Sequence, residues 1–168
     1  SRFERSLNLS YDMYKLWEMV KDITDLNADI ASRQIQQLNV RSLFEKCHKW
    51  TEEQQRIRES ILYYPIAKNV SDKLANTIKE FTNYLSIIEV ITSPLLRQRH
   101  ISMIRELFAS NPKNYVDSSS TFYELISIKI LDLKEQFAKI YEIAKSEYKI
   151  EKNVRNIVND LIMLSVRL

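Results

Sequence analysis

The chain contains no glycine in 168 residues, although glycine makes up about 7% of an average protein. Glycine is the residue that adopts positive φ at no steric cost. Every turn that needs positive φ must therefore use Asn, Asp or Ser, or be absent. Long helices with few tight turns satisfy this condition, and a hydrophobic content of 45% is sufficient for a core. We predict an all-α fold, an antiparallel helical bundle or elongated rod of four to six helices.

Apolar residues recur at intervals of three and four residues, which is the spacing of one helix face. The pattern predicts three helices in the first half of the chain. The first has its main apolar face from Leu9 onward and ends near residues 32–36, and the other two cover residues 40–61 and 70–88. Pro65 ends the second helix, because the residue before a proline is pushed out of the α region. Ser93 and Pro94 suit the N-cap and first position of a fourth helix that ends near Phe108.

Residues 109–120 are rich in Asn, Pro, Asp and Ser and are predicted to form a loop. Thr121 and Glu124 then have the spacing of a capping box, which predicts the start of a helix. Helical periodicity continues from there to the end of the chain, with a break near Ile130.

We expect two units, a helical hairpin at residues 1–65 and a helical subdomain at residues 66–168. Because Ser1 stands where Met would begin a chain, we expect a fragment of a much larger protein.

The first predicted helix carries a second apolar face, formed by Phe3, Leu7, Tyr14 and Trp17. A helix that is apolar on two sides is usually sandwiched between neighbours. We therefore expect Trp17 to lie in the core, and we expect the same of Trp50.

Charge and cysteine content exclude several classes of function. The 25 Lys and Arg residues nearly balance 22 Asp and Glu residues, and the net charge of +3 is too small and dispersed to indicate nucleic-acid binding. No run of about 18 apolar residues predicts a membrane span. The single cysteine, Cys47, cannot form an internal disulfide, which fits a reducing cytoplasm. It lies on an apolar helix face and is expected to be a buried structural thiol.

The absence of glycine also excludes nucleotide chemistry within the chain. P-loops, dinucleotide fingerprints and nucleophile elbows all need glycine where the backbone approaches a phosphate or turns sharply. His48 and His100 do not have the ligand spacing of a zinc site. We therefore expect no catalytic residues, no metal and no cofactor in this chain.

Two carboxylates interrupt the apolar seam of the last predicted helix. The seam runs through Phe137, Ile140 and Ala144, and the same 3-4 spacing then reaches Glu147 and Glu151. In one interpretation the seam drifts around the helix, as an ideal helix does against a 3.5-residue repeat. Ile143 and Ile150 would then replace the glutamates, which would face water. In the other, the glutamates accept charge from Arg97, Arg99 or His100, because unpaired buried carboxylates are costly.

One segment resembles a known family closely. Residues 81–101 read FTNYLSIIEVITSPLLRQRHI and resemble, without gaps, the linker-region motif of dynein heavy chains. The matching residues are Phe81, Leu85, Ile88, Pro94, Leu96, Arg97, Arg99 and His100. Ser86, Ser93 and Ile101 replace the Pro, Asn and Trp of that motif, so the chain resembles a divergent member.

The resemblance extends to both sides of this motif. Downstream, the matching positions are Ala144, Glu147, Ile150, Glu151 and Ile157, with Ser146 at a Lys position and Leu161 at a Trp position. Upstream, Leu16 and Trp17 resemble the Leu-Trp at the start of the region, and Trp50 fits the helix that follows.

The resemblance implies a mechanical function. Dynein heavy chains are microtubule motors with an ATPase ring, and the linker is a helical rod that swings over the ring. The chain would be the neck and N-terminal part of that rod, with the ATP sites elsewhere in the parent protein.

The implied partners are the AAA+ ring and remainder of the heavy chain, other dynein subunits through the upstream tail, and a second heavy chain. The implied location is cytoplasmic, on microtubules. The alternative is a helical-bundle adaptor or tethering subunit that binds partner helices.

Overall fold

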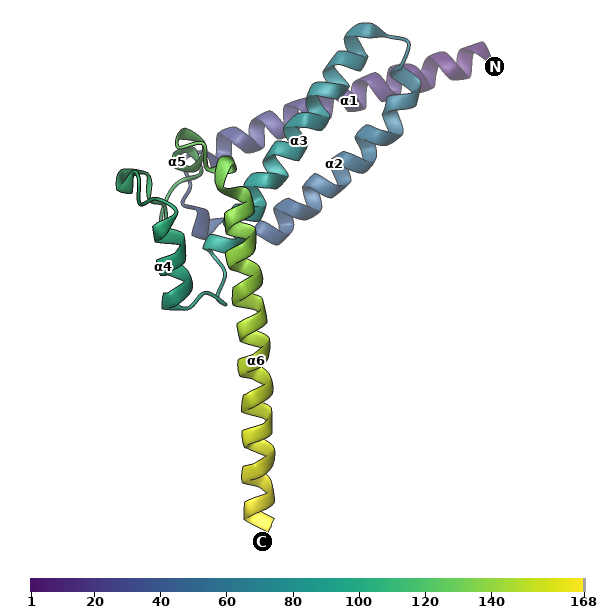
Figure 1. Cartoon of the computed structure of the whole chain (residues 1–168). Helices are drawn as coiled ribbons and strands as arrows, with labels where there is room; N and C mark the ends of the chain where they lie inside the picture. The colour runs from purple at the N-terminus through teal and green to yellow at the C-terminus, as the bar shows by residue number, and fades with distance from the viewer. Residues whose placement is uncertain (168) are drawn as a thin grey trace.

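The computed structural model describes residues 1–167, and helices make up most of this part of the chain (Figure 1). Six α-helices follow one another as α1 (Arg2–Ile30), α2 (Val40–Ile61), α3 (Pro65–Ile91), α4 (Gln98–Glu106), α5 (Phe122–Ser127) and α6 (Lys134–Arg167). Short 3-10 helices lie at Ile35–Gln37, Pro112–Asn114 and Ile130–Leu133. Within residues 1–167, β-type pairing is limited to an isolated bridge between Gln34 and Thr121. The predicted all-α class is confirmed.

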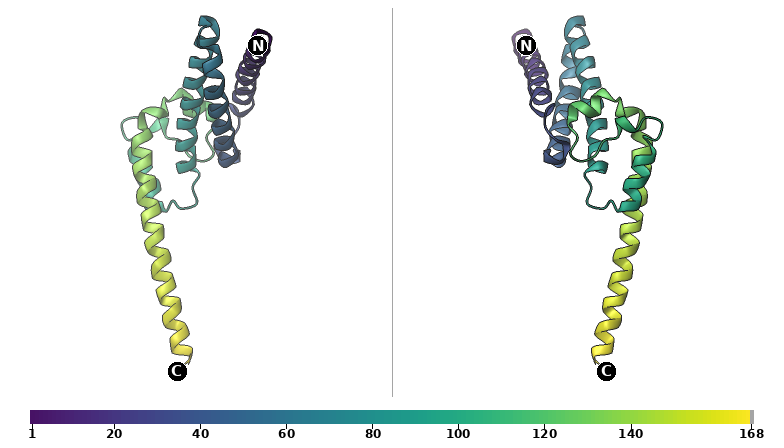
Figure 2. Two further views of the ribbon diagram at one scale, coloured as in Figure 1. Left: turned by 90° about the vertical axis from the view of Figure 1, so that its right-hand side faces the viewer. Right: turned by 90° about the vertical axis from the view of Figure 1, so that its left-hand side faces the viewer.

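Helices α1, α2 and α3 form the upper part of the body, with α2 packed against both of the others (Figures 1 and 2). Their inner faces bury large aliphatic side chains, among them Leu16, Ile57 and Leu85, which have no exposed surface. Burial of such side chains stabilises the fold by about 1.5–3 kcal/mol each. The predicted apolar faces of these helices therefore form the core.

The second half of the chain packs against the lower end of α3. Phe122 of α5 contacts Phe81 and Tyr84 of α3 edge to face, with ring centroids 5.9 and 5.4 Å apart. At the start of α6, Lys134 donates a hydrogen bond from Nζ to Oδ1 of Asn83, at 2.7 Å. These contacts place α6 beside α3 at the point from which it runs downward.

Two connecting segments pair with each other and close this part of the body. The backbone N–H groups of Ile35 and Gln36 donate to the carbonyls of Ser120 and Ser118, at 2.9 and 3.0 Å. The predicted loop at residues 109–120 is present, apart from the short turn at Pro112–Asn114. The capping box at the start of α5 is confirmed, since Thr121 Oγ1 accepts from the backbone N–H of Glu124.

Two predicted helix starts are wrong, and both involve proline. Helix α3 begins at Pro65 and not near Val70, because proline fits the first helical position, where no intrahelical N–H bond is needed. Ser93 and Pro94 do not start α4. They lie in the turn before it, where Ser93 Oγ accepts from the Leu95 N–H at 3.2 Å, and α4 begins only at Gln98.

The second apolar face of α1 is not sandwiched in this chain. Phe3, Leu7, Tyr14 and Trp17 are all more than half exposed, so the prediction that Trp17 lies in the core is wrong. Trp50 is partly buried and packs against the core. Helical periodicity identifies a face that excludes polar residues, but it does not show whether the covering element belongs to the same chain.

One residue within residues 1–167 adopts positive φ, and it is not Asn, Asp or Ser. Lys129, between α5 and the 3-10 helix Ile130–Leu133, adopts the left-handed conformation with φ of 55° and ψ of 49°. Asn, Asp and Ser were the residues expected at such a turn, so that expectation is wrong here. The predicted break near Ile130 is confirmed, and the strain at Lys129 is what allows the chain to turn into α6.

Replacement of Lys129 by glycine should therefore stabilise the protein. A left-handed residue with a Cβ costs roughly 1–2 kcal/mol, so Lys129→Gly should raise the free energy of unfolding by about 1 kcal/mol, measured by urea denaturation. The matched control is Lys139→Gly on the exposed side of α6, which should lower it by about 1 kcal/mol. A loss of stability in both variants would contradict the strain assigned to Lys129.

Helix α6 is 34 residues long, and only its first half contacts the body (Figure 2). Phe137, Ile140 and Ala144 are buried, whereas every residue from 152 to 167 is exposed. In both figures the second half projects downward alone. In the described part of the chain, no helix combines the length and apolar character of a membrane span.

Candidate functional site

Five charged or polar side chains meet where α6 leaves the body. Arg97, Arg99 and His100 come from the start of α4, and Glu147 and Glu151 come from α6. The two glutamates are four residues apart, so they lie one turn apart on the same side of α6. We call these five residues the ionic cluster.

The ion pairs within the ionic cluster connect the two helices at several points. Glu151 accepts from Arg97 Nη2 at 3.2 Å through one oxygen and from Arg99 Nη2 at 3.1 Å through the other. Glu147 Oε2 accepts from Arg99 Nε and lies 2.8 Å from His100 Nε2. The structure therefore agrees with the second interpretation, in which Glu147 and Glu151 pair with Arg97, Arg99 and His100.

The alternative, in which the apolar seam drifts, does not occur in this chain. Ile143 and Ile150 are 39% and 62% exposed, so neither replaces the glutamates on the covered face. Glu147 and Glu151 keep the positions that the 3-4 spacing gives them, opposite the start of α4.

His100 is the buried centre of the ionic cluster, with 1% of its surface exposed. Its Nδ1 accepts a hydrogen bond from the backbone N–H of Arg97 at 2.9 Å. Because a backbone N–H can only donate, Nδ1 carries no proton in this arrangement and Nε2 is the donor to Glu147. The imidazole therefore satisfies a free N–H at the first turn of α4 and holds a carboxylate of α6 at the same time.

The pKa values of both glutamates are lowered by their partners. Hydrogen bonding from Arg99, and then from His100, lowers the pKa of Glu147. Hydrogen bonding from Arg99, and then from Arg97, lowers the pKa of Glu151, and the same contacts raise the pKa of Arg99. The glutamates are therefore charged at neutral pH.

The charged members of the ionic cluster are partly open to solvent. Their side chains are between 35% and 51% exposed, while His100 beneath them is buried. Solvent-exposed ion pairs contribute little stability individually and are weakened by salt. Together, the ion pairs and hydrogen bonds of the ionic cluster hold α6 in place against α4.

The remaining motif residues lie outside the ionic cluster. Phe81 is buried in α3 against Phe122, and Leu96 is partly buried at the edge of the core. Pro94 is exposed in the turn before α4. The turn that contains Pro94 and Leu96 brings the chain from α3 to α4, and so determines where Arg97 begins the next helix.

Residues 1–167 hold no cluster of metal-binding side chains. No set of three or more His, Cys, Asp or Glu side chains there is arranged to hold a metal ion. Cys47 is buried as predicted, and burial raises the pKa of its thiol. A thiol with a raised pKa is a poor nucleophile at neutral pH.

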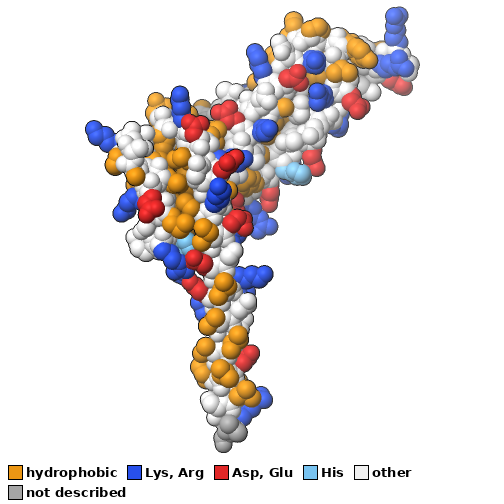
Figure 3. Space-filling view, in the orientation of Figure 1, with side chains coloured by type: hydrophobic (Ala, Val, Ile, Leu, Met, Phe, Trp, Pro, Cys, Tyr) orange, Lys and Arg blue, Asp and Glu red, His pale blue; other side chains and the backbone are white. Residues whose placement is uncertain are grey.

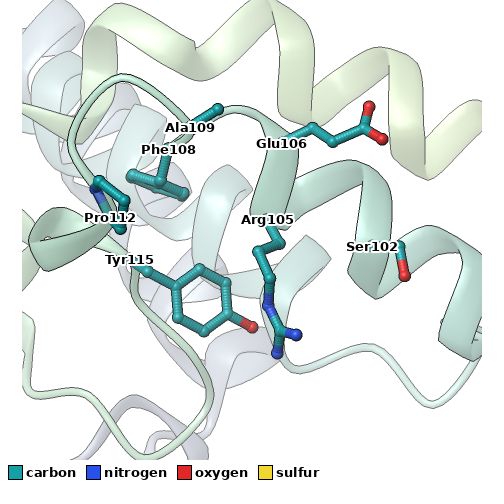
Figure 4. Close-up of a pocket in the computed structure, with 7 residues that line it drawn as sticks. All are labelled: Ser102, Arg105, Glu106, Phe108, Ala109, Pro112 and Tyr115. Atoms are coloured by element: carbon teal, nitrogen blue, oxygen red, sulfur yellow. The ribbon is translucent and has the colours of Figure 1, made fainter.

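A hollow of about 620 Å³ lies beside the other end of α4 (Figure 4). The guanidinium of Arg105 lies over the ring of Tyr115, 5.2 Å from its centroid, and Tyr115 packs edge to face on Phe108. Ser102, Glu106, Ala109 and Pro112 complete the lining. None of the predicted site residues lines this hollow.

A buried polar contact between α1 and α2 was missed in the sequence. Asp12 is buried, and its carboxylate accepts from Arg56 Nη2 at 3.2 Å and from Ser60 Oγ at 2.7 Å. A signal was present, because Asp12 precedes Leu16 by four residues and Met19 by seven, which places it on the buried face. The partners on α2 carried no comparable signal.

Comparison with known proteins decides the family of this chain. A family model described as "Dynein heavy chain, N-terminal region 2" matches residues 6–167. The chain belongs to this dynein heavy chain family. No curated protein and no solved structure matches it. The ionic cluster thus lies within the N-terminal region 2 of a dynein heavy chain.

The lowered pKa values of the two glutamates predict a pH dependence of the stability of this dynein region. A carboxylate whose pKa is lower in the folded state stabilises that state above its ordinary pKa of 4.5, and this stabilisation is lost as the pH falls through the lowered value. The free energy of unfolding should therefore fall less steeply below pH 4.5 in Glu147→Gln with Glu151→Gln than in the unmodified chain.

The measurement is urea denaturation at neutral and acidic pH, with Glu135→Gln as the control. Glu135 lies on the exposed side of the first turn of α6 and is not part of the ionic cluster. Its replacement should leave the acid dependence of the unmodified chain unchanged. Identical acid dependence in the double variant and the unmodified chain would contradict the pairing.

Proposed function

We propose that this chain is a mechanical linker segment of a dynein microtubule motor, a lever that transmits ATP-driven change in the motor ring to the tail. The ionic cluster is the observation that carries the proposal. It joins α4 to α6 at the point where α6 leaves the body, so a rotation of the body becomes a displacement of the end of α6. An uninterrupted helix of 34 residues extends for about 50 Å, at 1.5 Å per residue.

The geometry of α6 supports a lever because close-packed helices resist deformation. Phe137 packs against Phe108, with ring centroids 6.5 Å apart, and the ionic cluster makes a second contact further along the same helix. Several contacts spread along one rigid helix, from Lys134 and Phe137 near its start to Glu151, fix its direction, and the ionic cluster is the one farthest along it. Loss of the ionic cluster should therefore reduce the transmission of force without changing the ring.

The proposal assigns partners and location to the parent protein. The segment works with the AAA+ ring and the remainder of the same heavy chain, with other dynein subunits through the upstream tail, and in a homodimer. ATP binds in the parent ring and not in this segment, which itself has no enzymatic activity. The motor acts in the cytoplasm, on microtubules.

A helical adaptor or tethering subunit is the second candidate function. The exposed apolar face of α1 favours it, because contiguous exposed apolar surface marks a site of protein interaction. Such a protein would bind partner helices through α1 and would not need the ionic cluster for its activity.

Reversal of the two arginine charges in the complete motor distinguishes the two functions. Arg97→Glu with Arg99→Glu places four carboxylates together and should separate the second contact of α6 from α4. Gliding velocity on microtubules should fall, while ATP binding by the ring should change little. Introducing Glu147→Arg and Glu151→Arg into the same chain should restore velocity by re-forming the pairs with opposite polarity.

The control is Arg5→Glu with Arg58→Glu, two exposed arginines of α1 and α2 outside the ionic cluster. It reverses the same amount of charge and should leave the gliding velocity close to that of the unmodified motor. An equal loss of velocity and ATP binding in the Arg97 and Arg99 variant would contradict a lever function. So would the absence of any recovery in the charge-swapped protein.

A further inference from the structure

An apolar stripe runs along the projecting half of α6. It consists of six large aliphatic side chains, each between 47% and 62% exposed, namely Ile150, Val154, Ile157, Val158, Leu161 and Leu164. Figure 3 shows hydrophobic side chains along this part of the helix, below the charged groups where it leaves the body. The stripe spans the 15 residues from Ile150 to Leu164, a rise of about 21 Å along the helix, and so amounts to about four turns.

The stripe continues a face of α6 that is already covered higher up. Phe137, Ile140 and Ala144 are buried by the body, and Glu147 and Glu151 are covered by the start of α4. The same alternation of three and four residues then leads from Glu151 to Val154, Val158 and Leu161. Val154, Val158 and Leu161 therefore continue the covered face, and Ile150, Ile157 and Leu164 widen the apolar surface to one side of it. Helix α4 covers this face only as far as Glu151.

The spacing of the stripe specifies the shape of what covers the rest. Apolar residues at alternating intervals of four and three keep to one side of a helix and fit the side chains of another helix laid along it. The opposite side of α6 carries Lys152, Asn156 and Asn159, which suit solvent. Arg155 and Asp160 flank the stripe on its two edges and are free to pair with charges of opposite sign.

We propose that the apolar stripe is the docking surface for a helix from another part of the same dynein heavy chain. That helix lies along α6 below α4 and presents its own apolar 3-4 seam. It carries an acidic residue opposite Arg155 and a basic residue opposite Asp160. The inference rests on the family membership of the chain and is independent of the lever function proposed above.

Continuity with an intrachain interface is the reason to assign the stripe to the same polypeptide. The upper part of this surface is covered by α3, α4 and the connecting segments of one chain, through both apolar burial and ion pairs. Near the end of α6, Ile162, Met163 and Val166 add exposed apolar surface outside the stripe. Apolar surface on several sides of a helix is typical of a permanently buried element and not of one that binds transiently.

Photo-crosslinking in the complete heavy chain tests this inference. The photoreactive residue p-benzoylphenylalanine replaces Leu161 or Val158 in the stripe and, as matched controls, Asn159 or Lys152 on the opposite side of α6. The crosslinked peptides are identified by mass spectrometry in a mixture of unlabelled and ¹⁵N-labelled heavy chains. We expect Leu161 and Val158 to give products within one heavy chain, to a segment with apolar residues at 3-4 spacing, and the controls to give none.

Three outcomes would overturn the inference. The first is a product that joins a labelled to an unlabelled heavy chain, which would indicate a second copy. The second is a product with another subunit. The third is the absence of any product from either stripe position in protein that incorporates the probe.

A second measurement is limited proteolysis of residues 150–167, in which Leu161→Asp should expose the segment to cleavage and Asn159→Asp should not. Equal cleavage of both variants would also contradict the inference. None of these results depends on gliding velocity, so a failure here leaves the lever proposal to its own test.

Discussion

The contact of His100 with both α4 and α6 is the interaction on which the arrangement of this chain depends. The buried imidazole accepts a hydrogen bond from the backbone N–H of Arg97 and donates one to the carboxylate of Glu147. One side chain therefore links the start of α4 to the middle of α6. The two arginines then surround the same carboxylates from the solvent side. No other residue type combines a buried acceptor with a donor on the opposite edge of one rigid ring.

The direction of α6 follows from this contact together with the aromatic packing above it. Phe108 and Phe137 hold the upper part of the helix in the core, and the ionic cluster holds it a few turns lower. Beyond Glu151 the helix has no contact with the body. The covered and uncovered halves belong to one uninterrupted helix of 34 residues, and Val154, Val158 and Leu161 continue its 3-4 apolar spacing beyond the covered part.

Local signals in the sequence predicted most of the helices and offered the pairing of α4 with α6 as one of two interpretations. Thr121 with Glu124 marked a helix start. Two glutamates on an apolar seam could either face water or pair with the basic residues near Pro94, and only the structure decides between these two arrangements. The resemblance to dynein heavy chains agrees with the family match over residues 6–167. The division into units at residues 65 and 66 stays a prediction.

The features that could not be predicted depend on tertiary context. Trp17 has the spacing of a core residue, but spacing does not identify which chain covers it. Lys129 is left-handed because the packing of α5 and α6 on either side requires a turn there, and no local preference of lysine indicates it. Asp12 was on the buried face of its helix, but its partners come from α2, more than 40 residues later, and only the fold brings them together.

The most direct test of this account is the distance between α3 and the projecting half of α6. Spin labels on cysteines introduced at the exposed residues Lys73 and Asn159 report this distance by pulsed electron paramagnetic resonance, and Cys47 is buried away from the label. The account predicts one narrow distance distribution in the unmodified chain. It predicts a broad distribution in Glu147→Gln with Glu151→Gln. An equally narrow distribution at the same distance in the double variant would show that the ionic cluster does not fix α6.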